Sequence, residues 1–198
     1  MIYTTYTEKT FAIPTLEGIS AKTIAEHLKL YAGYVKHSNL ILTKIAELSK
    51  TPEDATANTY IIGELRRRLG FEFGGMKNHE LYFEQFEGGF KKTEGTALEH
   101  KMNEQWGSIE NWITEFKQLA MTRGIGWAFL YLDESSGNLI NTWVGEQHDG
   151  HLPGMKPILA LDMWEHSYML DVPPSEKKTY VDAFFNNVNW ETVAKRYK

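Results

Sequence analysis

A carboxylate and an imidazole follow a short apolar run near the C-terminal end of the chain. Residues 157–161 (PILAL) are typical of a buried strand, and the segment LDMWEHSYMLD continues from it. Asp162 and His166 stand four residues apart, so a helical turn beginning at Asp162 would point both side chains to one side. With Trp164 beside them, they would form half of a transition-metal site. The alternative, in the absence of further ligands, is an Asp that caps a helix and a His in its first turn.

Two more histidines lie on segments with helical periodicity in the first half of the chain. His27 shares a helix face with Tyr31 and Tyr34, and alone it fits a half-buried polar residue beside core tyrosines. His79 follows Gly75 by four residues, and alone it fits a hydrogen-bonded histidine between helices equally well. Added to the pair at the strand end, they give three imidazoles and one carboxylate. That set suits Mn or Fe, and also Zn, with a fifth position left for water or substrate.

The elements that must position these residues are predicted from periodicity and capping signals. Ser20 is a candidate N-cap for a long helix over 21–48, and a second helical pattern runs over 59–86, so the simplest topology is an antiparallel hairpin. The pair Gly74-Gly75 inside the second helix indicates a bend or a close approach. The remaining elements are helices at about 97–105, 108–122, 174–186 and 190–197, and β-rich runs at 126–132, 139–144 and 157–161.

This order of elements predicts an α+β fold with two domains. Residues 1–90 form an N-terminal antiparallel helical hairpin domain, and the glycines between 88 and 95 mark the boundary. Residues 91–198 form a C-terminal α+β domain in which helices accompany a small three-stranded antiparallel sheet.

Composition excludes several classes of protein. The chain has no Cys, which excludes disulfides, thiolate metal sites and cysteine nucleophiles, so His, Asp, Glu or water must hold any metal. A net charge of −5 argues against nucleic acid as a partner. No apolar run approaches the roughly 20 residues that cross a membrane, and the N-terminus shows no secretory signal. We therefore expect a soluble, cytoplasmic protein, with His37, His100 and His151 solvated on its surface.

Over nearly its whole length the chain resembles the iron/manganese superoxide dismutase family. Five blocks carry the resemblance in the family's order, and DMWEH is close to diagnostic: SAKTIAEH, GGMKNH, QWGSIENWITEFKQLAMTRGIGWAFLYL, DMWEHSYMLD and AFFNNVNWETVAKRY. The resemblance implies four metal ligands, which are His27, His79, Asp162 and His166. It also implies that Tyr34 is the active-site tyrosine and that Trp127 and Trp164 wall the metal pocket.

The activity implied by the resemblance is the conversion of two superoxide anions to dioxygen and hydrogen peroxide at one Mn or Fe ion per subunit. Zinc would bind the same ligands but could not cycle between redox states. One alternative is a metal-binding homologue without turnover, acting as a scaffold. A metal-dependent hydrolase is another alternative, but it would need an acid/base carboxylate beside the metal-bound water. The aromatic, amide-lined pocket offers no obvious candidate.

The resemblance also bears on which metal is used. Iron-type members commonly supply a Gln at the position of Gly75, so the glycine here is similar to the manganese type and makes Mn the preferred metal. In that type the polar group that meets the metal-bound solvent comes from the loop before DMWEH, where either Gln147 or His148 could serve. The one that does not serve is expected to be an exposed loop residue. A cambialistic enzyme, active with either metal, stays open.

Three departures from the family concern the substrate gate and the subunit contact. The spacing from His27 to Tyr34 is seven residues, where the family usually has eight, which would remove a local helical bulge. The family's gate histidine is absent, and Met169 replaces its partner tyrosine, so Tyr31 is a candidate stand-in. Glu165 is present, and in the family it reaches across a homodimer, although a helix-start glutamate is the simpler alternative. A homodimer is therefore expected, with a tetramer left open.

Overall fold

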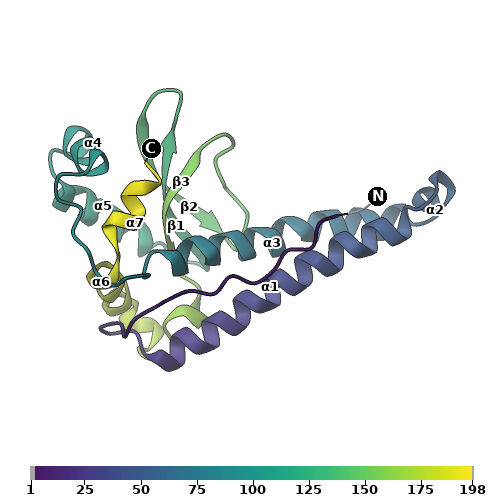
Figure 1. The fold of residues 1–198 in the computed structure, drawn as a ribbon, viewed down its shortest axis with the longest axis horizontal. Coiled ribbons are helices and arrows are strands. Elements are labelled where there is room, and N and C mark those ends of the chain that lie inside the picture. Colours follow the sequence, from purple (N-terminus) through teal and green to yellow (C-terminus); the bar gives the residue numbers. More distant parts are fainter. Residues whose placement is uncertain (1–2, 198) are drawn as a thin grey trace.

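The computed structural model describes residues 3–197, and these residues adopt the predicted α+β fold (Figure 1). The helices are α1 (Ala21–Leu48), α2 (Pro52–Ala57), α3 (Thr59–Glu84), α4 (Ala97–Trp106), α5 (Ile109–Ala120), α6 (Lys177–Asn187) and α7 (Trp190–Lys195). The strands are β1 (Gly126–Asp133), β2 (Asn138–Gly145) and β3 (Lys156–Asp162), and two short 3-10 turns cover Glu165–Ser167 and Pro174–Glu176. Among the described helices, none is both long and apolar enough to cross a membrane.

Helices α1 and α3 form the long antiparallel hairpin that periodicity predicted (Figure 1). The Ser20 side chain accepts a hydrogen bond from the Thr23 amide and so begins α1 at the expected residue. Helix α2 sits at the hairpin tip and is begun by a capping box between Thr51 and Asp54. Helix α1 is α-helical over its whole length, in agreement with the loss of a bulge between His27 and Tyr34.

The N-terminal segment lies along this hairpin as an extended chain without helix or strand (Figure 1). The Asn39 side chain makes paired 2.8 Å hydrogen bonds with the backbone of Tyr6. Farther along, the Phe11 ring packs against Tyr31 and Phe83 on the two helices. The segment therefore covers one side of the hairpin with both polar and aromatic contacts.

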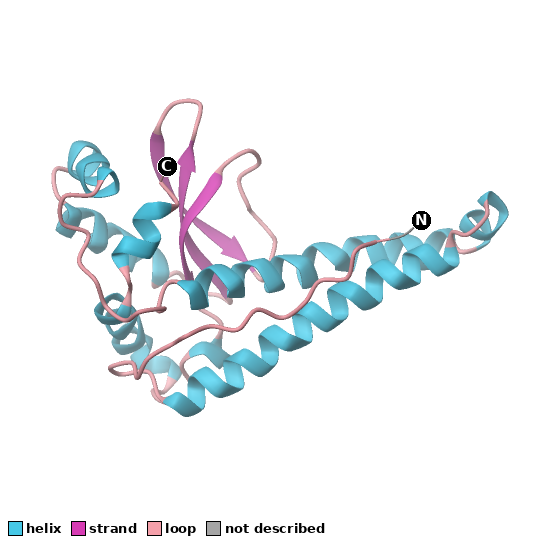
Figure 2. Cartoon of the chain, in the orientation of Figure 1, coloured by secondary structure: helices cyan, strands magenta, loops and turns pink. Residues whose placement is uncertain are grey.

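The three strands form an antiparallel sheet, as predicted (Figure 2). Their order in the sheet is β2-β1-β3. Its central strand β1 is buried along almost its whole length, which matches its unbroken apolar sequence. The Gln85 side chain, just beyond α3, pairs with both the amide and the carbonyl of Ala160 on β3 at 2.8 Å. Because these buried hydrogen bonds hold the end of the hairpin on the sheet, residues from both halves can meet at one site.

Two local predictions from the sequence are wrong. Asp162 does not begin a helical turn: it is the last residue of β3, and His166 lies in the 3-10 turn that follows. His151 is not a solvated surface residue, because its ring is partly buried against Phe129 and its Nδ1 is hydrogen-bonded to the Tyr131 hydroxyl. His37 and His100 are exposed, as expected.

Candidate metal centre

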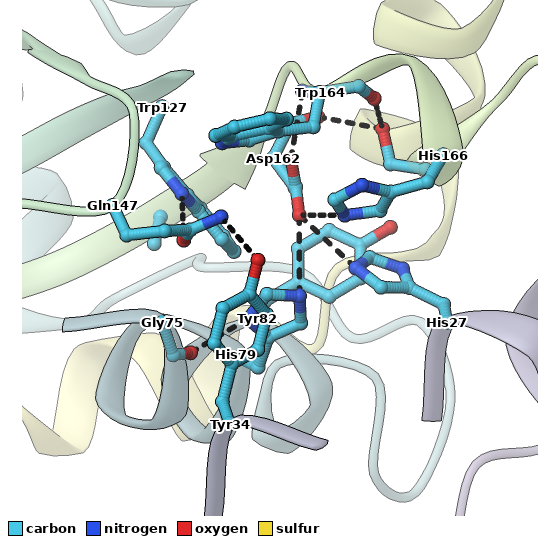
Figure 3. A network of polar contacts seen from close by, with 12 residues as sticks. His27, Tyr34, Gly75, His79, Tyr82, Trp127, Gln147, Asp162, Trp164 and His166 are labelled. Carbon is cyan, nitrogen blue, oxygen red and sulfur yellow. Dashed lines mark hydrogen bonds and ion pairs between the residues drawn. The ribbon is translucent and has the colours of Figure 1, made fainter. Parts of the chain in front are cut away.

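The four predicted ligands converge between the hairpin and the sheet (Figure 3). His27 comes from α1, His79 from α3, Asp162 from the end of β3 and His166 from the turn after it. One potential ligand atom from each residue lies within 4.8 Å of all the others. His27, His79 and Asp162 are fully buried, whereas the His166 side chain keeps 21% of its surface exposed. We call these four residues the ligand cluster.

The Asp162 carboxylate is oriented by its own turn. Its Oδ1 accepts a 2.8 Å hydrogen bond from the Trp164 amide, which leaves Oδ2 facing the histidines. The Nε2 atoms of His27 and His166 lie 3.0 Å and 3.3 Å from Oδ2, and that of His79 lies 3.6 Å away. Burial acts to raise the pKa of Asp162, but His166 and His27 outweigh it and hold the pKa below its usual range. The group is therefore a carboxylate, the form that a metal needs.

His79 is held in the tautomer that suits metal binding. Its Nδ1 lies 2.6 Å from the Gly75 carbonyl, which can only accept, so Nδ1 carries the hydrogen and Nε2 keeps its lone pair. Burial, helped by the neighbouring His27, lowers the pKa of His79 to about 3, so the ring stays neutral. Its buried Nε2 has no hydrogen-bond partner among residues 3–197. A buried lone pair aimed at a carboxylate and two further imidazoles fits a bound cation.

A chain of hydrogen bonds leads from the sheet to Tyr34 (Figure 3). The Trp127 indole N–H can only donate, and it donates to Gln147 Oε1 at 2.9 Å. The Gln147 amide N–H must then face the other way, and it donates to the Tyr34 hydroxyl at 2.9 Å. Since the Tyr34 oxygen accepts from Gln147, its own hydrogen stays available to another acceptor. Burial is the main cause that raises the pKa of Tyr34, so the phenol keeps its proton at neutral pH.

The glycine pair in α3 is explained by close approach rather than by a bend. A Cβ on Gly75 would overlap ring carbons of Tyr34, and a Cβ on Gly74 would overlap the Gln147 carbonyl oxygen. Helix α3 continues without interruption through both residues. The pair therefore lets both α1 and the loop after β2 pack closely on α3 next to the ligand cluster.

Gln147 and His148 point in different directions. Gln147 is fully buried beside Tyr34 and Trp127, whereas His148 packs its ring against Phe71 and above Gly70, outside the ligand cluster. The preceding residue Glu146 adopts a left-handed backbone with φ 50, and its carbonyl accepts a 3.0 Å hydrogen bond from the Trp164 indole N–H. This uncommon backbone conformation sets the direction of the loop next to the site.

Of the other residues predicted for the site, two tryptophans line the ligand cluster, whereas Tyr31 and Glu165 lie farther out. Trp127 and Trp164 wall the site, packing their rings against His79 and His166 respectively. Tyr31 turns toward the N-terminal segment: its hydroxyl accepts a 2.9 Å hydrogen bond from the Lys9 amide, and its ring packs against Phe83 beside the site. Glu165 is exposed.

Two aromatic residues at the site were not identified from the sequence. The Phe83 ring lies 4.9 Å from His27 and 6.1 Å from His79, measured between ring centroids, so it covers the inner side of the ligand cluster. Phe71 lies near Tyr34, Trp164 and His148. Phe71 lies eight residues before His79 and Phe83 lies four residues after it, so the three side chains share one face of α3. This helical periodicity is the sequence signal that could have identified the two phenylalanines.

The fold and the site define a class: a protein with a largely buried cluster of three histidines and one aspartate between a helical hairpin and a small sheet. Residues 93–196 match the model of the C-terminal domain of iron/manganese superoxide dismutases. The chain is 37% identical over 186 residues to a superoxide dismutase (Fe) of Cupriavidus metallidurans, covering 92% of this chain and 90% of that protein.

Relatives of both metal types are found. A superoxide dismutase (Fe) of Aquifex pyrophilus is 34% identical, with 92% of this chain and 86% of that protein covered. A superoxide dismutase (Mn) of Haemophilus ducreyi is 32% identical, with 87% of this chain and 83% of that protein covered. The chain belongs to the iron/manganese superoxide dismutase family.

Proposed function

We propose that this chain is a superoxide dismutase that binds one manganese or iron ion through His27, His79, Asp162 and His166. The observation that carries the proposal is the convergence of three imidazoles and one carboxylate within 4.8 Å, in a chain of this family. A hydrolase would need a further carboxylate beside the bound water. Asp162 is the sole carboxylate in the ligand cluster, and the polar side chains beside the cluster are the amide of Gln147, the phenol of Tyr34 and the indoles of Trp127 and Trp164.

The bound ion would supply the redox step, taking an electron from one superoxide, which leaves as dioxygen, and returning it to a second, which leaves as hydrogen peroxide after gaining two protons. The protein's own part is to hold the ligands, to exclude bulk water and to hold a proton ready. Asp162 and the neutral His79 are oriented by Trp164 and Gly75, as described above. Tyr34 holds a proton whose position is set by Gln147.

Metal analysis and activity on one sample test this proposal. We expect purified protein to contain close to one Mn or Fe per chain and to remove superoxide in proportion to that content. Metal content without activity, even after reconstitution with Mn and with Fe, would instead select the scaffold alternative. Zinc alone would likewise leave the scaffold alternative and contradict the dismutase function, whereas no metal under all conditions would contradict both functions.

The Tyr34→Phe variant tests the proton donor. The change removes the hydroxyl and keeps the ring that packs against His79. Since positioned proton donors typically contribute about 10²–10⁴-fold and water can replace part of that, we expect kcat to fall about 10- to 100-fold. Stopped-flow superoxide decay on metal-loaded protein measures the effect. An unchanged kcat at equal metal content would remove Tyr34 from the mechanism.

We propose manganese as the preferred metal. The polar group beside Tyr34 is supplied by Gln147 from the loop, and Gly75 leaves no room for a side chain because the Tyr34 ring occupies its surroundings. The expected result is that protein reconstituted separately with each metal is at least about tenfold more active with Mn, which corresponds to about 1.4 kcal/mol. Equal activities would indicate a cambialistic enzyme, and higher activity with Fe would contradict the preference.

We also propose that a second copy of the chain covers the exposed edge of the site. Around the partly exposed His166, the apolar side chains of Leu30, Met169 and Leu170 are 42%, 53% and 47% exposed. Glu165 lies in the same turn, at the edge that a second copy would meet. Sedimentation should report a dimer that Glu165→Lys weakens at least about tenfold. A monomer at micromolar concentration would contradict the proposal.

A further inference from the structure

An ion pair on α3 lies close to the ligand cluster without belonging to it. The Arg68 guanidinium contacts one carboxylate oxygen of Glu72 with two nitrogens, Nε at 2.9 Å and Nη2 at 2.8 Å. The Glu72 side chain is only 9% exposed, whereas that of Arg68 is 46% exposed. Glu72 is therefore a nearly buried negative charge whose partner, Arg68, stands on its solvent side.

Phe71 connects this pair to the site. The Arg68 guanidinium lies over the Phe71 ring, 3.8 Å from its centroid. The same ring packs against Tyr34 and Trp164, with centroid distances of 6.0 Å and 6.3 Å. The guanidinium thus covers the outer face of a ring that borders two residues walling the ligand cluster.

This border coincides with one of the two parts of the site that are open to solvent, the other being the edge at the partly exposed His166. His27, His79 and Asp162 have no exposed surface, so a small solute can approach the ligand cluster only past less buried neighbours. Tyr34 and Trp164 are both partly exposed, and both touch Phe71. Phe71, with Arg68 over it, therefore stands beside the approach to Tyr34.

The charges of Arg68 and Glu72 reach this approach. The Arg68 guanidinium stands on the Phe71 ring that borders Tyr34, and Glu72 is the next residue along α3 and is paired with Arg68. A nearly buried carboxylate is only weakly screened by water and salt, so without a partner it would repel an anion near Tyr34. Superoxide is a monoanion, and its rate of encounter depends on the local field.

We propose, resting on the dismutase function above, that Arg68 is a positioning residue that neutralises Glu72 and holds Phe71, and so keeps the approach to Tyr34 open to an anionic substrate. Its charge, more than its contact with the ring, sets how readily a small anion reaches the metal. Glu72 is the group whose charge Arg68 must cancel. The roles of the two residues are therefore coupled, and removing both should restore what removing Arg68 alone takes away.

The test is a double-mutant cycle read out by anion binding as well as by activity. Metal-loaded wild type, Arg68→Gln, Glu72→Gln and the double variant are titrated with azide, a small monoanion, and the dissociation constant is followed by the visible spectrum of the metal. For Arg68→Gln we expect azide affinity and kcat/KM to fall about tenfold at low ionic strength, within the range that local fields produce. The double variant should return to within about twofold of wild type, and the loss should shrink at 0.5 M salt.

The exposed pair Lys44–Glu47 on α1 provides the matched control. It is also an ion pair within the hairpin, with side chains 51% and 48% exposed, and it lies toward the hairpin tip. Lys44→Gln makes the same change in net charge and should leave azide affinity within about twofold of wild type, because the high dielectric constant of the water around an exposed charge weakens its field. A fall equal to that of Arg68→Gln would attribute the effect to net charge alone and overturn the proposal.

Other outcomes separate the possible failures. If Arg68→Gln lowers the melting temperature but leaves azide affinity unchanged, the pair is only a structural brace and the proposal is wrong. If Arg68→Gln does not fold, the double variant and Arg68→Lys provide the test instead. Both variants should bind azide within about threefold of wild type. Weaker azide binding in both would contradict the proposed role of the Arg68 charge. If azide binding follows the cycle while no variant, nor the wild type, removes superoxide, then the dismutase function fails and the charge role stands.

Discussion

Asp162→Asn is expected to abolish metal retention and, with it, superoxide removal. Asn keeps the shape of the side chain but replaces the carboxylate, whose Oδ2 faces three imidazole nitrogens at 3.0 to 3.6 Å. Since loss of residues that merely support ligands costs about 10–100-fold in metal affinity, we expect loss of a charged ligand to cost at least about 100-fold. Metal content after dialysis against a chelator, measured by elemental analysis, should fall from near one ion per chain to a small fraction.

The control for this change is Asp149→Asn. Asp149 is exposed, and it lies on the loop that carries Gln147, so the variant makes the same chemical change outside the ligand cluster. It should retain metal and activity like the wild type. Circular dichroism on the Asp162→Asn protein checks that the fold persists. Near-stoichiometric metal and full activity in that folded variant would show that the ligand assignment is wrong.

Gly75→Ala is expected to reduce activity about 10- to 100-fold, although the residue has no functional group, since it displaces a proton donor. The added Cβ would overlap the Tyr34 ring, so the ring must move, and its hydroxyl would leave the 2.9 Å hydrogen bond with Gln147. Overpacking of this kind costs about 1–3 kcal/mol of stability, against about 1 kcal/mol that Ala gains over Gly in a helix. Thermal unfolding and kcat on metal-loaded protein measure the two effects.

Gly63→Ala provides the matched comparison within the same helix. A Cβ at Gly63 would meet nothing within 4 Å. This substitution should therefore stabilise the protein by about 1 kcal/mol through helix propensity alone and leave kcat unchanged. If Gly75→Ala behaved like Gly63→Ala, the close packing of Tyr34 on α3 would not matter for catalysis.

Local signals in the sequence predicted the elements that carry the site. Ser20 begins α1 because its side chain caps the Thr23 amide, a contact three residues away that depends on no distant part of the chain. The β-rich runs of the three strands likewise predicted their bounds to within one residue at each end, because residue type along a short run is a local signal. The identities of the four ligand candidates rested on residue types and family-like motifs, which the sequence carries directly.

What the sequence left open depends on contacts between segments far apart along the chain. Which of Gln147 and His148 faces Tyr34 is decided by the left-handed backbone at Glu146 and by its hydrogen bond to Trp164, eighteen residues later. His151 was wrongly predicted to be solvated because its neighbours in sequence are polar, whereas Tyr131 and Phe129 reach it across the fold.

The direction of Tyr31 and the close approach of Tyr34 to Gly75 have the same origin. The sequence by itself determined the helices, the strands and the chemistry of the candidate ligands, because those follow from local periodicity and residue type. Only the tertiary structure decided which side chains face the ligand cluster and how charges such as Arg68 and Glu72 stand beside it. Those directions are set by the packing of α1, α3 and the loop after β2 on one another, and no single segment encodes them.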